Sequence, residues 1–277
     1  MILIADSGST KTDWCLAETG RVVQRMSTQG INPFHQDADF IKGVLTDELL
    51  PQIGEAEPLC IYFYGSGCRA EMVDGMKSVL GDAFPHCGVI EACGDLLAAA
   101  RAVCGREEGI ACILGTGSNS CLYDGQNVKF NTPPLGYILG DEGSGAVLGR
   151  LFLNAVFKRQ LPSVVCKTFL DESRLTIPEV VKRVYTEPMA NRFLASLSVY
   201  IHHLLGYDSV HNLVVDNFRQ FFRRNISQYG RHDLKIGAIG SVAYYYSECL
   251  EEAATAEGYE IGNIVRSPME GLVRFHA

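Results

Sequence analysis

The sequence lacks the features that mark several common classes of protein. None of its ten cysteines stands in a C-x-x-C pair, the spacing typical of zinc and thiol–disulfide sites. No apolar run approaches the ~20 residues of a membrane-spanning helix, and the run Ile2–Ala5 is too short for the hydrophobic core of a signal peptide. We therefore expect a soluble, cytoplasmic protein with buried, reduced thiols.

Positive charge is also scarce. The chain has 24 Lys and Arg residues against 32 Asp and Glu residues, a formal net charge of −8. An acidic surface repels polyanions, so this balance argues against nucleic-acid or membrane partners. With 277 residues, 47% of them hydrophobic and 20% charged, the chain can form one large or two ordinary globular domains.

The chain opens on a hairpin pattern. The apolar run Ile2–Ala5 predicts a buried strand that ends at Asp6, and a turn over residues 7–10 leads to a second strand, Thr12–Leu16. Backbone N–H groups in a Gly-containing turn form an anion-binding nest, so this tip can bind a phosphate. Asp6 could hold a magnesium ion, directly or through water, because magnesium prefers carboxylate and water oxygens.

Strands and helices then alternate. Apolar residues at helical spacing predict a helix over 37–50 that Pro51 stops, and Leu59–Tyr64 predicts a buried strand ending at Gly65-Ser66-Gly67. After a further short strand, Gly94-Asp95 opens another helix. Meandering strands followed by this alternation predict a mixed sheet with helices packed on it. We place this first domain over residues 1–109.

The second half repeats the opening pattern. Ile110–Leu114 predicts a buried strand, Gly115–Asn119 a turn and Ser120–Tyr123 a second strand. This repetition indicates a fold duplicated about a cleft. We place the second domain over residues 110–277, with the last helix, near 268–276, expected to be able to pack back on the first domain.

Polar or Gly-rich motifs recur at strand ends and helix starts along the chain. In open α/β sheets ligands bind at the carboxyl ends of strands, so these motifs could share one cleft. Their order and spacing resemble the N-acetylglucosamine kinase family, grouped with the BadF/BadG/BcrA/BcrD ATPases in the sugar kinase/Hsp70/actin superfamily. The motifs are Asp6–Thr12, Gly94-Asp95, Gly115–Asn119, Gly140–Ser144 and Gly237–Ser241. The resemblance implies an α/β fold with two ribonuclease H-like (actin/hexokinase-type) domains, mixed five-stranded sheets with helices, and ATP and sugar in the cleft between the domains.

The resemblance also implies roles for individual residues. Asp95 would be the general base that takes a proton from a sugar hydroxyl, and Asp6 would lie on the magnesium side of the site. The implied ATP contacts are Ser7, Gly8, Ser9, Thr10, Lys11, Thr12, Thr116, Gly117, Ser118, Gly240 and Ser241. The implied sugar contacts are Asn32, Ser66, Gly67, Asp95, Thr116 and Asp141. The expected reaction is ATP-dependent phosphorylation of N-acetylglucosamine to its 6-phosphate, by a homodimer.

Several alternatives stay open at this point. Asp95 and Asp141 could each be a helix N-cap, the commonest role for Asp in that position, and Lys11 could be a solvated charge. The turn around Lys11 lacks the glycines of a P-loop, and Gly115-Thr116-Gly117 lacks the third glycine of a dinucleotide fingerprint. The substrate could be glucosamine or N-acetylmuramic acid. The protein could also be a BadF-type ATPase that activates a dehydratase, or a sugar sensor without enzymatic activity.

Overall fold

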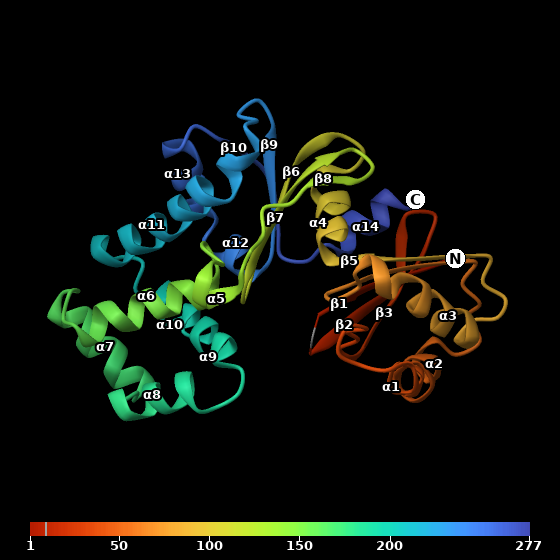
Figure 1. Ribbon diagram of the computed structural model, residues 1–277, viewed down its shortest axis with the longest axis horizontal. Coiled ribbons are helices and arrows are strands. Elements are labelled where there is room, and N and C mark those ends of the chain that lie inside the picture. The colour runs from red at the N-terminus through yellow and green to blue at the C-terminus, as the bar shows by residue number, and fades with distance from the viewer. Residues whose placement is uncertain (9) are drawn as a thin grey trace. The chain divides into compact units, whose positions relative to one another are not determined.

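The computed structural model describes residues 1–8 and 10–277, which form two compact units (Figure 1). Unit 1 comprises Met1–Arg106 and Pro268–Ala277, and unit 2 comprises Glu107–Ser267. The break between the units therefore falls three residues before the predicted boundary, because the first strand of unit 2 already begins at Glu108. The last ten residues, which the prediction counted in the second domain while allowing their helix to pack back on the first, belong to unit 1.

The sheet of unit 1 has the order β3-β2-β1-β4-β5. Strands β1 (Ile2–Ser7), β2 (Lys11–Glu18) and β3 (Arg21–Gln29) form an antiparallel meander. Strands β4 (Cys60–Gly65) and β5 (Val89–Gly94) add parallel to β1. The predicted mixed sheet with five strands is confirmed for this unit.

Helices cover both faces of this sheet (Figure 1). Helices α1 (Ala38–Val44), α2 (Leu50–Ile53) and α3 (Val73–Ala83) contribute apolar residues to a core that also contains Leu3, Ala5 and Trp14. Helices α4 (Asp95–Cys104) and α14 (Met269–Phe275) pack on β1 from the other side. Gly271 permits the close crossing of α14 and α4, because a Cβ there would lie 2.4 Å from the carbonyl oxygen of Ala102.

The prediction that Pro51 stops the first helix is wrong. The helical path continues from α1 through a π-helical segment, Leu45–Leu49, and α2 runs on to Ile53 before ending at Gly54. Pro51 falls in the first turn of α2, where its missing N–H does not interrupt an α-helical hydrogen bond of that helix.

The sheet of unit 2 has the corresponding order, β10-β9-β6-β7-β8. Strands β6 (Glu108–Leu114), β7 (Ser118–Asp124) and β8 (Val128–Phe130) are antiparallel neighbours. Strands β9 (Lys235–Ile239) and β10 (Glu260–Val265) add parallel to β6. Two sheets with the same strand order confirm the predicted duplication and the ribonuclease H-like class.

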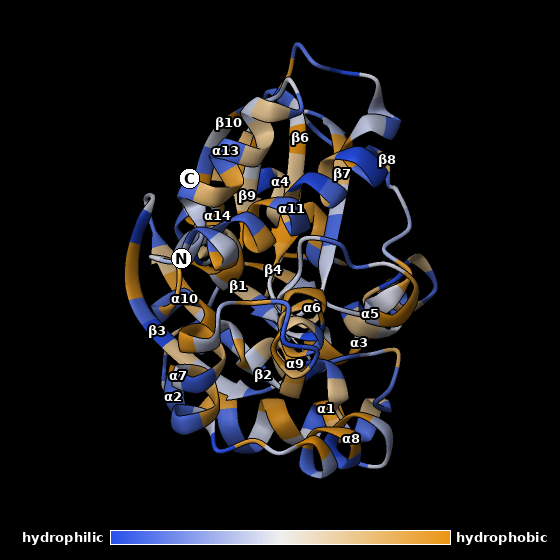
Figure 2. Ribbon diagram, turned by 90° about the vertical axis from the view of Figure 1, so that its left-hand side faces the viewer, coloured by the Kyte–Doolittle hydropathy of each residue, from blue (hydrophilic) through white to orange (hydrophobic). Residues whose placement is uncertain are grey.

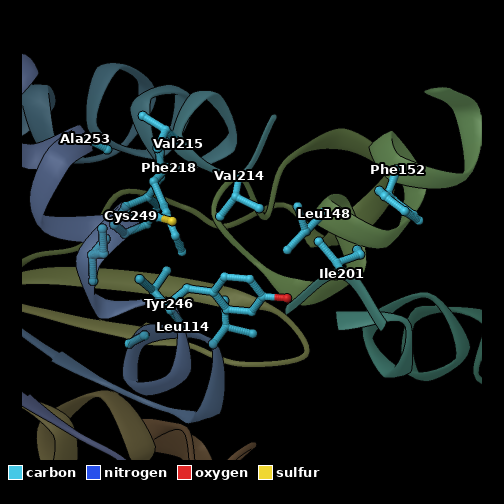
Figure 3. Close-up of a cluster of buried hydrophobic side chains, with 14 of the residues drawn as sticks. Leu114, Leu148, Phe152, Ile201, Val214, Val215, Phe218, Tyr246, Cys249 and Ala253 are labelled. Atoms are coloured by element: carbon cyan, nitrogen blue, oxygen red, sulfur yellow. The ribbon is translucent and has the colours of Figure 1, made fainter. Parts of the chain in front are cut away.

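Unit 2 is richer in helices than unit 1. Its helices are α5 (Gly136–Leu139), α6 (Gly145–Phe157), α7 (Ser163–Ser173), α8 (Ile177–Tyr185), α9 (Ala190–Ser196), α10 (Ser198–His203), α11 (Asp208–Arg224), α12 (Ser241–Tyr245) and α13 (Ser247–Ala256). Figure 3 shows how α6, α11 and α13 bring Leu148, Phe152, Val214, Phe218 and Cys249 into one buried cluster. The hydropathy colouring in Figure 2 shows hydrophilic and hydrophobic residues together on single helices, as on α1 and α8.

Two helices, α12 and α13, follow β9 in place of one continuous helix. The break lies at Tyr246, whose buried ring joins the core (Figure 3). Its hydroxyl donates a hydrogen bond of 2.5 Å to the Ser198 carbonyl. Anchoring this side chain fixes the bend between α12 and α13. Across the described residues, we find no helix with the length and apolar character that crossing a membrane requires.

Candidate active site

The turn after β1 exposes a small set of polar groups. The Gly8 N–H donates to the Lys11 carbonyl at 3.0 Å and closes the turn. Thr10 and Lys11 are exposed, and Lys11 Nζ lies 2.6 Å from the Asp13 carboxylate. Ser9, a predicted ATP contact, lies outside the described residues. The tip therefore offers Gly8, Thr10 and Lys11 to a ligand.

Two other hydroxyls of this turn have an internal role. Ser7 and Thr12 are 1% and 0% exposed, and their Oγ and Oγ1 atoms lie 2.5 Å apart. Both hydroxyls accept the Ile31 N–H, while Ser7 donates to the Ile31 carbonyl and Thr12 to that of Gln29. These side chains hold the loop that leads to Asn32, so the sequence prediction that they contact ATP does not extend to their hydroxyls.

The predicted sugar contacts Asn32 and Gly67 lie against each other. Gly67 has φ +80°, and a Cβ there would lie 2.1 Å from Asn32 Oδ1. The same Oδ1 accepts the Phe34 N–H at 3.1 Å, which orients the amide. Within the described part of the chain, Asn32 Nδ2 has no hydrogen-bond partner, so it can donate to a ligand.

Asp95 begins α4 and receives a hydrogen bond from the neighbouring strand end. Ser66 Oγ donates to Asp95 Oδ2 at 2.7 Å, and the Ser66 N–H is fixed by the Ser7 carbonyl at 2.9 Å. The N-cap of α4 is Gly94, and no side chain caps the helix. The N-cap alternative for Asp95 is therefore wrong, and the carboxylate lies at the positive end of the helix dipole, which favours negative charge.

Asp6 completes a group of carboxylates in unit 1. It pairs across the strands with Asp13, and burial, followed by the charges of Asp95 and Asp13, raises its pKa to about 7. In the described residues there is no group of three or more His, Cys, Asp or Glu side chains arranged to hold a metal ion. A half-buried carboxylate beside other negative charges still suits magnesium, which keeps several waters and substrate oxygens.

In unit 2 the turn after β6 packs on the start of α6. The Gly115 N–H donates to the Gly117 carbonyl at 2.9 Å, and the carbonyls of Gly115 and Thr116 accept the N–H groups of Gly145 and Ala146. These bonds fix the turn and leave the Thr116 side chain exposed. The Ser118 side chain, in contrast, is buried.

Asp141 lies directly beside this turn. It has φ +53° and is 9% exposed, and a Cβ on Gly117 would lie 3.0 Å from its Oδ2. Burial raises its pKa to about 6, while hydrogen bonds from backbone N–H groups, that of Ser118 first, act in the opposite direction. The cap of α6 is Ser144, whose hydroxyl accepts the Val147 N–H, so the N-cap alternative for Asp141 is also wrong.

Asn217 is a supporting residue that the sequence prediction missed. Its buried side chain accepts the Gly143 N–H at 3.1 Å and donates to the Ser144 carbonyl at 3.4 Å, so it fixes the turn that follows Asp141. The sequence did contain a hint of this role: Asn217 is an amide residue on the otherwise apolar face of α11, between Val214 and Phe218. A buried polar side chain in such a position normally has a specific partner.

Gly240 and Ser241 lie at the start of α12. Gly240 has φ +121°, and a Cβ there would lie 2.2 Å from the Leu114 carbonyl oxygen. The backbone of β9 therefore passes directly against the end of β6, an approach that only glycine allows. Ser241 is exposed at the first position of α12.

One solved structure decides the family. A protein of Porphyromonas gingivalis, described as a candidate N-acetylglucosamine kinase, is 50% identical, with 100% of this chain and 98% of that chain covered and a TM-score of 0.95. The chain belongs to the N-acetylglucosamine kinase family. No protein-family model matches this family member, and no curated protein matches it either.

More distant structures share the fold of this kinase-family protein. A candidate N-acetylglucosamine kinase from Chromobacterium violaceum is 16% identical with a TM-score of 0.67, covering 99% of this chain and 98% of that chain. The ethanolamine utilization protein EutJ from Carboxydothermus hydrogenoformans is 11% identical with a TM-score of 0.55, covering 99% and 89%. Both likenesses show the actin-like two-domain fold.

The predicted site residues of this family member thus form two groups. Unit 1 contains the first group, where β1, β4 and β5 end: Asp6, Ser66 and Asp95. Nearby in the same unit, the side chain of Asn32 contacts Gly67. In unit 2, Thr116 and Gly117 lie beside Asp141. The first group can accept a proton and bind a cation, and the second can donate and accept hydrogen bonds to a polar ligand.

Proposed function

We propose that this protein transfers the γ-phosphoryl group of ATP to the 6-hydroxyl of N-acetylglucosamine. The observation that carries the proposal is the carboxylate of Asp95, oriented by Ser66 at 2.7 Å, in a chain 50% identical to a candidate N-acetylglucosamine kinase. A general base must be held in one orientation to reach a particular hydroxyl, and this hydrogen bond provides that restraint.

In the proposed reaction Asp95 accepts the proton of the sugar hydroxyl. The hydroxyl oxygen forms a bond to the γ-phosphorus while the bond from that phosphorus to the β–γ bridging oxygen breaks, and ADP leaves. Such a transfer depends mainly on positioning and charge neutralisation. Magnesium, which Asp6 would help to hold, would supply part of that neutralisation when bound.

The remaining residues bind and orient the two substrates in this proposal. The sugar contacts are Asn32, Ser66, Gly67, Asp95, Thr116 and Asp141, with the free Nδ2 of Asn32 and the carboxylate of Asp141 as the polar groups best placed to choose among sugars. The ATP contacts are the backbone of residues 8–12 with Lys11, the turn of Thr116, Gly117 and Ser118, and Gly240 with Ser241. We propose a cytoplasmic homodimer, which light scattering and cell fractionation can test.

A coupled assay of ADP release tests the function. We expect turnover with N-acetylglucosamine above that with glucosamine, N-acetylmuramic acid or glucose, and a product whose phosphorus resonance couples to the C6 protons. Asp95→Asn keeps the size of the side chain and should lower kcat by roughly 10²–10⁴-fold. Absence of turnover with every sugar, or an Asp95→Asn variant of undiminished activity, would refute the proposal.

The second candidate is an ATPase that activates a dehydratase through an iron–sulfur cluster. Such a cluster needs cysteine thiolates that reach the metal. Cys112 and Cys121 are 1% and 0% exposed on β6 and β7, which favours the kinase. A brown protein with sugar-independent ATP hydrolysis after anaerobic purification would favour the activator instead.

A further inference from the structure

Unit 2 contains a cavity that the proposed reaction does not use. It measures about 600 Å³ and lies between α5, α6, α8 and α9. This volume is in the range of small-molecule sites. None of the described residues to which we assign a role in binding ATP or sugar lines it.

One wall of the cavity is the apolar side of α8. Ile177, Val180, Val181, Val184 and Tyr185 line it, and none of these side chains is buried. Ile177 is 58% exposed and Tyr185 80% exposed. The helix itself is well defined, because Thr176 and Glu179 form a complete capping box. Val180 and Val184 pack partly against the core of unit 2, whereas Ile177, Val181 and Tyr185 remain exposed along the cavity.

The opposite rim is polar and positively charged. Arg150 and Asn154 on α6 and Lys158, the residue that ends the helix, follow one another at intervals of four and therefore lie on one side of it. Neither cation has a salt-bridge partner among the described residues, and the lining contains no carboxylate. The chain as a whole has a net charge of −8, whereas the lining of this cavity carries two positive charges and no negative one.

We propose that this cavity binds a small anionic amphiphile, an alkyl carboxylate of medium chain length. The alkyl chain would cover the apolar side of α8, and the carboxylate would be bound by Arg150 or Lys158, which are separated by roughly 12 Å along α6. A neutral apolar ligand would leave the cations unused, and a cationic one would be repelled.

Isothermal titration calorimetry with three matched probes tests the assignment. Octanoate, octan-1-ol and octylammonium have the same alkyl chain and differ in charge. We expect octanoate to bind at least about tenfold more tightly than octylammonium, with octanol between them. The double variant Arg150→Gln/Lys158→Gln should weaken octanoate by a similar factor and leave octanol unchanged.

Matched variants separate the cavity from general effects. Val181→Trp should fill the cavity and abolish binding of octanoate, whereas Val164→Trp, on the exposed surface of α7, should not. Lys77→Gln/Lys167→Gln removes the same net charge from helices that do not line the cavity and should leave the affinity intact.

Three results would overturn the assignment. Equal binding of all three probes would show that the cations do not select an anion. Binding only to vesicles of anionic phospholipid, with no affinity for octanoate, would make this face a membrane contact. A homodimer that Val181→Trp dissociates, again without affinity for octanoate, would make it an interface between two copies. All three readouts are independent of sugar phosphorylation.

Discussion

Replacing Gly67 with Ala tests how the loop that carries Asn32 is positioned. The new Cβ would lie 2.1 Å from Asn32 Oδ1 and 2.8 Å from its Cγ, so the side chain of Asn32 must move. The φ of +80° adds backbone strain, which for a non-glycine residue costs about 1–2 kcal/mol. If Asn32 also gives up its hydrogen bond from the Phe34 N–H, about 1 kcal/mol more is lost. We expect a total destabilisation of roughly 2–3 kcal/mol.

Gly54→Ala is the matched control for this substitution. Gly54 also has positive φ, +64°, but a Cβ there meets nothing within 4 Å. This variant should therefore show the backbone strain alone, on the order of 1–3 kcal/mol, because its ψ of −129° lies outside the left-handed helical region. Trp14, the only tryptophan, is buried in unit 1, so urea unfolding followed by its fluorescence reports on the unit that contains both glycines.

Kinetics should separate the two glycines further. Displacement of Asn32 in Gly67→Ala should raise the KM for N-acetylglucosamine by at least about tenfold, because shifts on the order of 1 Å at a binding group are costly. Gly54→Ala should leave that KM unchanged. In an Asn32→Ala background the clash is gone, so Gly67→Ala should then cost no more than Gly54→Ala. An undiminished cost in that background, or an unchanged KM for the sugar, would refute the contact between Asn32 and Gly67.

Three further predictions concern the site residues. The pKa of Asp6 is raised to about 7, so the native state binds more protons than the unfolded chain between about pH 4 and 7. The stability that protonated Asp6 contributes is therefore fully present below about pH 4 and is lost as the pH rises to about 7. Urea unfolding of Asp6→Asn should show a flatter decline over that window, with a gain over wild type by pH 8. Ser66→Ala should lower kcat by about tenfold, because Asp95 loses its orienting hydrogen bond. In thermal unfolding, Gly240→Ala should lower Tm far more than Gly230→Ala, because both have positive φ but only Gly240 faces a carbonyl oxygen, at 2.2 Å.

Each of these predictions has a contrary outcome. A parallel pH dependence of wild type and Asp6→Asn would show that Asp6 does not titrate in this window. Full activity of Ser66→Ala would remove Ser66 from the orientation of Asp95. Equal losses of Tm at Gly240 and Gly230 would show that the Leu114 carbonyl moves away from the added Cβ at position 240 without cost.

The sequence carried enough information to predict the strands that build both sheets around β1 and β6. Each has an apolar run with a Gly or hydroxyl turn after it, and that signal is local. Strands β8 and β10 were missed for physical reasons. Strand β8 has only three residues, and β10 contains Gly262 and Asn263, so neither shows the apolar run that predicts a buried strand. Both lie at an edge of their sheet, where one side of the strand has no neighbour.

For the candidate site, the sequence indicated which polar residues are candidates for function, but not which groups they contact in the folded chain. Asp95 is the first residue of a helix and Asp141 lies shortly before one, which suits an N-cap, yet Gly94 and Ser144 take the N-cap positions in the structure. Which residue caps depends on backbone angles at a single position. Asn217 shows the same limit, because its partners lie 73 and 74 residues away in the chain and no local pattern connects them.

The opening turn gains a second role from the structure. Its sequence, rich in hydroxyl residues, suggested that all of them face a phosphate, but the turn divides in two. Gly8, Thr10 and Lys11 lie at the tip, whereas Ser7 and Thr12 point inward and bind the backbone at Gln29 and Ile31. Asn32 follows Ile31 directly. Ser7 and Thr12, which flank the proposed phosphate-binding turn, therefore also hold the loop that carries the proposed sugar contact Asn32. A change of backbone at one of these two loops must therefore be transmitted to the other through the buried pair of hydroxyls.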